Sequence, residues 1–158
     1  MIKDSGERRE FETGAVRDIQ TGKGRCDLIP LDVVAQMFSA QKDLSSLFDN
    51  LNSFMHTKEE RYLLAAVIHF CEYVGWSVPT ALLEVAKHFE EGALKYAERN
   101  WEKGISVHCY IDSGVRHLLK HLRGDEDEKH DRAFIWNMIC AAWTCKHKSE
   151  LIDIPDLD

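Results

Sequence analysis

Residues 133–143 have the sequence AFIWNMICAAW, in which Asn137 carries the one polar side chain. A helix that is apolar on all sides belongs in the interior of a protein. The segment therefore predicts a buried last helix that ends near His147. Because a buried amide without partners is costly, we expect Asn137 to meet a polar group, a ligand or water inside the protein, close to the functional pocket.

An acidic run precedes this helix. Residues 125–128 are four consecutive carboxylates, and His130 lies two helical turns before Asn137 on nearly the same face. The helix dipole alone would favour these charges at a helix N-terminus. If other helices bring further carboxylates to the same place, the oxygen-rich cluster would suit Mg²⁺ or Mn²⁺.

Helical periodicity extends over most of the preceding chain. The expected helices lie at about 30–38, 42–56, 57–75, 80–98 and 107–123. Thr57 and Glu60 have the spacing of a capping box. No segment alternates persistently between apolar and polar residues, so we predict no sheet. The sequence thus predicts an all-α helical bundle of one domain over 1–158, with an irregular N-terminal arm over 1–29 and a loose acidic tail over 148–158.

The helix expected at 80–98 has an apolar face and a polar stripe. Its expected buried residues are Leu82, Val85, Phe89 and Tyr96, and its stripe is formed by Glu84, His88, Glu91, Lys95 and Glu98. Glu90 lies one step round from this stripe. A solvated face with i,i+4 ion pairs is sufficient to explain the stripe alone.

The helix expected at 107–123 also carries polar pairs. Asp112 and Arg116 have the favourable acid-first spacing of a surface ion pair. His117 and His121 have a spacing that can chelate zinc, which is weak evidence without a third ligand. In the loop before this helix, residues 95–103 mix aromatic and cationic side chains that suit a base and phosphates, or that anchor the loop.

The N-terminal stretch GAVRDIQTGKGRCDLIP (14–30) combines turn-forming residues with the cations Arg17, Lys23 and Arg25. Glycines let the backbone approach a ligand closely, and successive N–H groups in such turns can bind anions. We expect an ordered arm over the pocket, with one or more cations reaching a bound anion. The alternative is an arm that only packs on helices, through residues such as Phe11 and Leu28.

Composition excludes several classes of protein. The chain has 158 residues, 44% hydrophobic content and a net charge of −7, which disfavours binding to nucleic acid. Its five cysteines form no CxxC pair. No signal peptide and no apolar run long enough for a membrane is visible. We therefore expect a protein of a reducing cytoplasm, with neither a membrane nor a nucleic acid as partner.

Three blocks occur in the order FETGAVRDIQTGKGRCDLIP (11–30), EEGALKYAERNWEKG (90–104) and DSGVRHLLKHLRGDEDEKHDRAFIWN (112–137). They resemble the dATP/dGTP diphosphohydrolase domain family of phages and prophages, which is related to the MazG-like all-α nucleoside triphosphate pyrophosphohydrolases. The resemblance covers residues 11–38 and about 84–145. It implies hydrolysis of a purine (deoxy)nucleoside triphosphate to the monophosphate and pyrophosphate, with Mg²⁺ or Mn²⁺.

The resemblance is incomplete. Residues 40–80 look like an insertion relative to shorter relatives, and the EExxE and ExxD metal motifs of the MazG-like enzymes are not reproduced. Leu94 stands where a third acid is expected, and Asn137 stands where Asp is usual. The metal ligands are therefore candidates rather than residues transferred from the family.

The candidate site residues follow from these patterns together. Candidate catalytic residues are Glu90, Glu91 and Asp112, and candidate metal ligands are Glu90, Glu91, Asp112, Asp127, Glu128 and His130. Candidate nucleotide-binding residues are Arg17, Lys23, Arg25, Lys95, Asn100, Trp101, Arg116, His117 and Asn137. Metal-bound carboxylates can activate water and neutralise the leaving pyrophosphate, and Arg and Lys can hold the phosphates.

Two other functions remain open at this level. Adjacent His130 and Asp131, with His117 upstream, suggest an HD-type phosphohydrolase, although only 27 residues remain after Asp131 for the further Asp that such a site needs. A helical nucleotide-sensing or regulatory module without catalysis is the second. A homo-oligomer, dimer or tetramer, is expected from the family resemblance, with the apolar helix in the insertion as a possible contact surface.

Overall fold

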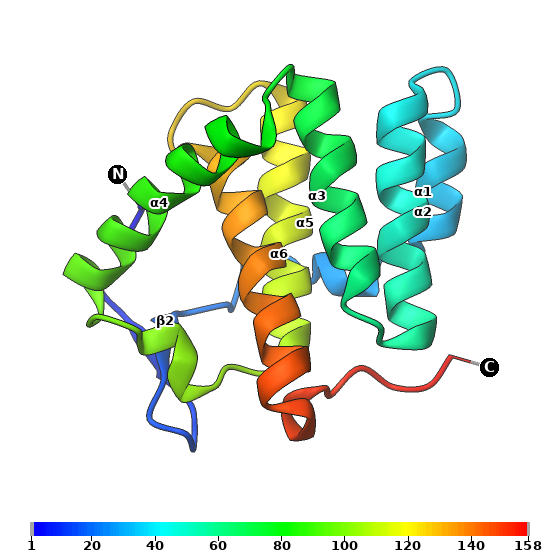
Figure 1. Ribbon diagram of the computed structural model, residues 1–158. Helices are drawn as coiled ribbons and strands as arrows, with labels where there is room; N and C mark the ends of the chain where they lie inside the picture. The colour runs from blue at the N-terminus through cyan, green and yellow to red at the C-terminus, as the bar shows by residue number, and fades with distance from the viewer. Residues whose placement is uncertain (1, 158) are drawn as a thin grey trace.

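The computed structural model describes residues 2–157 (Figure 1). Within them the helices are α1 (Leu31–Met37), α2 (Lys42–Thr57), α3 (Arg61–Val74), α4 (Val78–Lys95), α5 (Val107–Arg123) and α6 (His130–His147). Short 3-10 turns occur at Cys26–Leu28, Asn100–Lys103 and Ser149–Leu151. The predicted all-α bundle is confirmed. None of the described helices is long and apolar enough to cross a membrane.

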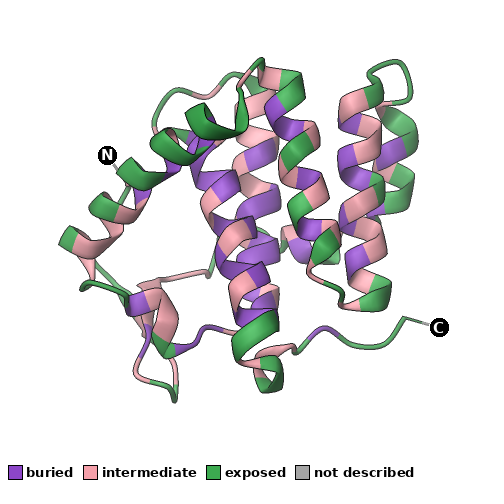
Figure 2. Cartoon of the chain, in the orientation of Figure 1, coloured by how far each residue is buried: buried purple, intermediate pink, exposed green. Residues whose placement is uncertain are grey.

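Helix α6 is the central helix of the bundle. It contacts α5 along its length and also α3 and α4, whereas α1 and α2 form an outer layer beside α3 (Figure 1). Contacts on several sides explain why α6 has no polar face, and Figure 2 shows it buried or half-buried except at its C-terminal end. Asn137 is 1% exposed, which confirms its predicted burial.

Helices α5 and α6 pack very closely at Gly114. A Cβ atom at this position would lie 2.5 Å from Met138 Cε and 3.2 Å from Asn137 Cβ. Both separations are below ordinary van der Waals contact. The absence of a side chain at Gly114 therefore sets the distance between α5 and the part of α6 that carries Asn137.

Residues 40–80, which the resemblance suggests are an insertion, contain α2 and α3. The capping box predicted at Thr57 and Glu60 is wrong. Thr57 is the last residue of α2, which Lys58 ends in the left-handed conformation (φ 59°). The Thr57 hydroxyl donates to the carbonyl of Ser53 and accepts from the N–H of Glu59. Since only three residues link the two helices, Thr57 cannot serve as the start of α3, which begins without a side-chain cap.

Helix α4 is shifted toward the N-terminus relative to the prediction of 80–98. The Ser77 side chain accepts from the N–H of Thr80, and Pro79 occupies the first turn, where its missing N–H costs nothing. Val85 is buried as expected, but Leu82 is 52% exposed, so its predicted burial is wrong. The reason is that α4 packs mainly on α6, and its outer face is exposed (Figure 2).

The N-terminal arm contains a short antiparallel hairpin that the sequence analysis does not predict. Strands β1 (Arg8–Glu10) and β2 (Val16–Asp18) pair with Arg9 opposite Arg17. The Asn100 side chain continues this pattern on the other side of β2, because its amide accepts from Val16 N–H (3.0 Å) and donates to Val16 C=O (2.9 Å). The Tyr96 hydroxyl accepts from the N–H of Asp18. The arm is therefore ordered, as expected.

The tail is not loose over its first half. Ile154 is 6% exposed, and the Asp153 carboxylate accepts from the backbone N–H of His108 (3.0 Å) and contacts its ring. Asp156 near the end has a fully exposed side chain. One buried apolar residue and one ion pair are enough to fix this segment against α5, which acidic composition alone did not indicate.

Candidate functional site

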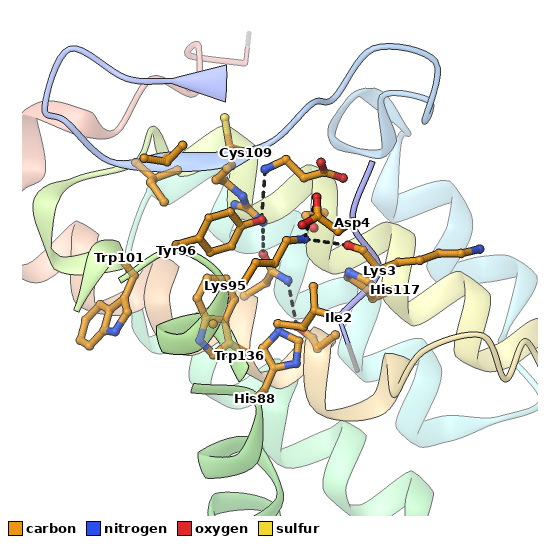
Figure 3. Close-up of a pocket in the computed structure, with 18 of the residues that line it drawn as sticks. Ile2, Lys3, Asp4, His88, Lys95, Tyr96, Trp101, Cys109, His117 and Trp136 are labelled. Carbon is orange, nitrogen blue, oxygen red and sulfur yellow. Dashed lines mark hydrogen bonds and ion pairs between the residues drawn. The ribbon is translucent and has the colours of Figure 1, made fainter. Parts of the chain in front are cut away.

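A cavity of about 560 Å³ opens between the arm, α4, the loop after it, α5 and the start of α6 (Figure 3). Its basic side chains are Lys3, Arg9, Arg17, Lys23, Arg25, Lys95, Arg99, Arg116, Lys120 and Lys129. Five acidic side chains line it as well: Asp4, Asp18, Glu91, Asp112 and Glu128. Although the chain carries a net charge of −7, this cavity is basic. It therefore suits an anionic ligand.

Arg17 reaches the floor of this cavity. Its Nη2 donates to Asn137 Oδ1 (3.1 Å), and its guanidinium lies 5.2 Å from the Tyr110 ring centroid and 5.8 Å from that of Trp136. Its Nη1 is buried without a hydrogen-bond partner, and no carboxylate in the described chain pairs with Arg17. Arg17 is a desolvated cation that contacts only ring faces and an amide. An anion that binds to such a cation gains more binding free energy than it would at a cation already paired with a carboxylate.

The wall beside Arg17 is aromatic. Trp136, whose Nε1 is also buried without a partner, lies against His88 (centroids 5.4 Å apart) and Phe89 (5.9 Å). Burial, followed by the charges of Arg132 and Arg17, lowers the pKa of His88 to about 3, so this imidazole is neutral. Ring faces with one unused N–H suit a flat heteroaromatic group.

Two histidines and two carboxylates converge between α5 and the start of α6. His117 Nδ1 and His130 Nδ1 lie 2.9 Å apart, and Glu128 Oε2 lies 4.0 Å from His117 Nδ1. His130 Nε2 lies 2.7 Å from Asp127 Oδ1. Burial and His130 hold the pKa of His117 well below its usual range, so this ring is neutral. His117, Glu128 and His130 therefore form a group that could hold a metal ion.

The chemistry of this group fits a divalent cation. If His130 donates from Nε2 to Asp127, its Nδ1 carries a lone pair that faces His117, which is the arrangement of a metal-binding histidine oriented by a carboxylate. Asp125, Asp127 and His130 form an overlapping group. Carboxylate oxygens suit Mg²⁺ and Mn²⁺, and imidazole nitrogens suit transition metals, so this donor set is compatible with a divalent cation.

Asp112 does not join this group. Its Oδ1 accepts from the N–H of Cys26 (2.6 Å), and its Oδ2 is paired with Arg116. Arg116 in turn donates to the carbonyls of Lys23 and Gly24. Both residues lie at the cavity, but they are used to hold the arm in place. The surface ion pair expected from their spacing is instead buried, because the arm covers it.

The two glutamates of α4 separate in the structure. Glu90 is exposed and is not among the residues that line the cavity. Glu91 lines it and forms an ion pair with Arg132 of α6. Neighbouring residues on a helix point about 100° apart, so only one of the pair can face the cavity.

The remaining candidates divide into residues that hold the arm and residues that face the ligand space. Lys23 is paired with Asp18, Arg25 with Asp27, and Lys95 Nζ donates to the carbonyl of Lys3. The side-chain amide of Asn100 forms its hydrogen bonds with the backbone of Val16. Trp101 lines the cavity and packs on Phe89 and Trp143. Of the arm cations that the sequence suggests, Arg17 alone lacks an acidic partner among the described residues.

His88 and Arg9 are two of the cavity residues that the sequence analysis did not select as candidates. His88 was part of the polar stripe of α4, and its burial against Trp136 was not visible from spacing. Arg9 lines the cavity with its guanidinium 4.7 Å from the Phe11 ring centroid. Its strand partner Arg17 is the signal that could have found it, but this pairing requires the unpredicted hairpin.

The model of the family "dATP/dGTP diphosphohydrolase, N-terminal" matches residues 74–154. The match runs from the end of α3 into the tail and contains the second and third of the three sequence blocks, whereas the arm and helices α1 and α2 lie outside it. No curated protein and no solved structure gives a significant match. The matched segment contains most of the residues that line the cavity. Because it spans just over half of the chain, this chain belongs to the dATP/dGTP diphosphohydrolase N-terminal family.

Proposed function

We propose that this chain hydrolyses a purine (deoxy)nucleoside triphosphate, dGTP or dATP, to the monophosphate and pyrophosphate in a metal-dependent reaction. The observation that carries the proposal is the buried, uncompensated Arg17 in a basic cavity that also contains His117 and Glu128. The phosphates of a nucleoside triphosphate would pair with Arg17, and the divalent cation bound to those phosphates would pair with Glu128 and His117. The family description names the same class of substrate.

In this proposal the ligand is oriented by two different surfaces. The Arg17 guanidinium can offer its Nη1 to phosphate oxygens while Asn137 holds Nη2, so the fork is fixed before the ligand arrives. The aromatic wall of Trp136 and Phe89 takes the base. This assignment places the nucleotide across the start of α6.

The reaction consumes one water, which attacks the α-phosphorus and displaces pyrophosphate. His117, Glu128 and His130 would hold the cation, which when bound supplies Lewis-acid polarisation of the phosphoryl oxygens. Glu91 faces the cavity as a carboxylate kept in place by Arg132, and we assign it the acceptance of the proton from water. Asp127 positions His130 through its ring Nε2.

Product analysis tests this proposal. The protein is incubated with each dNTP and Mn²⁺, Mg²⁺ or EDTA, and the nucleotides, pyrophosphate and triphosphate are separated and quantified. Monophosphate plus pyrophosphate that disappears with EDTA is the expected result. Release of triphosphate would indicate the HD-type reaction instead, and binding without turnover would indicate a sensing module.

A matched pair of variants tests whether the metal binds at Glu128. Glu128→Gln keeps the size of the side chain but removes a candidate ligand charge, so turnover should fall by about 10²-fold or more. Glu126→Gln removes an exposed charge from the same acidic run and should leave turnover unchanged. Equal activity in the two variants would exclude the His117 group as the metal site.

A further inference from the structure

A second cluster of metal-ligating side chains lies on the inserted helices, outside the cavity. Asp43 stands in the first turn of α2, and His69 and Glu72 stand one turn apart near the end of α3. Since α2 and α3 run antiparallel, these two ends are neighbours (Figure 1). One ligand atom from each residue lies within 4.8 Å of the others.

The distances in this cluster do not correspond to hydrogen bonds. His69 Nδ1 lies 3.7 Å from Asp43 Oδ1 and 3.9 Å from Glu72 Oε2. The Nδ1 atom is itself buried, and it has no hydrogen-bond partner. Three ligand atoms that lie this close together, at separations longer than hydrogen bonds, are spaced so that they could share one ion.

The charges in the cluster also favour a bound cation. Asp43 and Glu72 are two like charges in close proximity, and neither is paired with a Lys or Arg within residues 2–157. Glu72 is also close to the C-terminus of α3, where the helix dipole disfavours a carboxylate and where the last turn has no basic residue. A bound cation would remove each of these unfavourable interactions.

We propose that Asp43, His69 and Glu72 form a zinc site that links the start of α2 to the end of α3. One imidazole and two carboxylates are ligands that Zn²⁺ accepts, with a fourth position open to water. The site is open to solvent on its carboxylate side, because the side chain of Asp43 is 41% exposed and that of Glu72 is 59% exposed. It lies in the inserted segment before the family match, which begins at residue 74, and it does not depend on the proposed reaction.

The experiment measures Zn²⁺ binding by competition with a chromophoric chelator. The starting protein is the full chain stripped of metal, with His130→Ala introduced so that neither of the two groups that share His130 can contribute. We expect this protein to bind one equivalent of Zn²⁺ and to gain thermal stability from it. Adding His69→Ala should weaken binding by about tenfold or more and abolish the rise in Tm.

Two further variants guard against a folding artefact. Glu72→Gln is a conservative change at an exposed position and should weaken binding in the same direction, with an unchanged circular dichroism spectrum. Asp49→Asn removes an exposed carboxylate from α2 outside the cluster and should bind Zn²⁺ like its parent. The proposal is overturned if the parent binds no Zn²⁺, or if His69→Ala and Glu72→Gln bind it as tightly as the parent.

Discussion

At the scale of single residues, Arg17 shows how a cation can be kept in a protein interior without an acidic partner. Ring faces of Tyr110 and Trp136 offer cation–π attraction, and the Asn137 amide accepts one of its N–H groups. These contacts orient the guanidinium but leave Nη1 without a partner. The result is a binding group whose direction is set in advance.

Replacement of Arg17 tests this role. Arg17→Lys keeps the charge but removes the planar fork, so we expect kcat/KM for the preferred dNTP to fall on the order of 10²-fold, which corresponds to about 2.7 kcal/mol. Steady-state kinetics provide the measurement, with the exposed Arg61→Lys on α3 as control. Unchanged kinetics in Arg17→Lys would remove Arg17 from substrate binding.

Asp127 is expected to act through His130 rather than by contacting the substrate. Hydrogen bonds from His130 and Lys3 hold the pKa of Asp127 well below its usual range, so it is ionised. Asp127→Asn should weaken Mn²⁺ activation by about 10–100-fold, as is typical for groups that orient metal ligands. The concentration of Mn²⁺ at half-maximal activity measures this shift, and saturating Mn²⁺ should restore most of the rate. A loss that excess Mn²⁺ does not rescue would contradict an orienting role.

The sequence allowed Asn137 to be placed in the interior because a lone amide in an apolar helix leaves few alternatives. The sequence could not show that Asp112 and Asn100 hold the arm, since each bonds to a backbone group of the arm about 85 residues away in the chain. Spacing within a helix predicts which side chains share a face. It does not predict what covers that face.

At the scale of secondary-structure elements, the same limit explains the errors. The long helices were predicted because their periodicity is local. The hairpin was not, because its strands have three residues each and are held by Asn100 and Tyr96 from another segment. Leu82 was expected to be buried, but α4 has its main neighbour, α6, on one side.

The close approach of α5 and α6 gives a test at this scale. Gly114→Ala places a methyl group against Met138 and Asn137, so the two helices must shift, and we expect a loss of about 1–3 kcal/mol in the free energy of unfolding. Gly92→Ala in α4 meets nothing within 4 Å and should instead stabilise by about 0.5–1 kcal/mol. Urea denaturation compares the pair. Similar shifts for both variants would contradict the packing argument.

At the scale of the whole molecule, charge is strongly segregated. A chain of net charge −7 concentrates its cations around one cavity, which favours the approach of an anion there and disfavours contact with anions elsewhere. The arm and the tail, at opposite ends of the sequence, both close on α5. The predicted homo-oligomer stays a prediction.

The contact between tail and helix should make stability depend on pH. Contact with the Cys109 thiol and then with Asp153 raises the pKa of His108 to about 9, from an ordinary value near 6.5. Because the folded state holds this proton more tightly, the resulting stability is complete below about pH 6.5 and is lost as the pH rises through about 9.

Asp153→Asn keeps an acceptor for the His108 backbone but removes the charge. Its deficit in Tm relative to the wild type should therefore be largest near pH 6 and should shrink above pH 9. Asp156→Asn, with its fully exposed side chain, should show no such trend. Thermal melts across this pH range are the measurement, and a deficit for Asp153→Asn that does not change with pH would refute the His108 assignment.

The amide of Asn100 has one further consequence. A strand at the border of a sheet presents unpaired N–H and C=O groups that can recruit a strand from another molecule and start aggregation. On β2 the outward groups of Val16 are occupied by Asn100, and the next outward N–H, that of Asp18, is occupied by Tyr96. Side chains thus close the β2 border of this hairpin, so this border cannot act as a template for intermolecular β-sheet at high protein concentration.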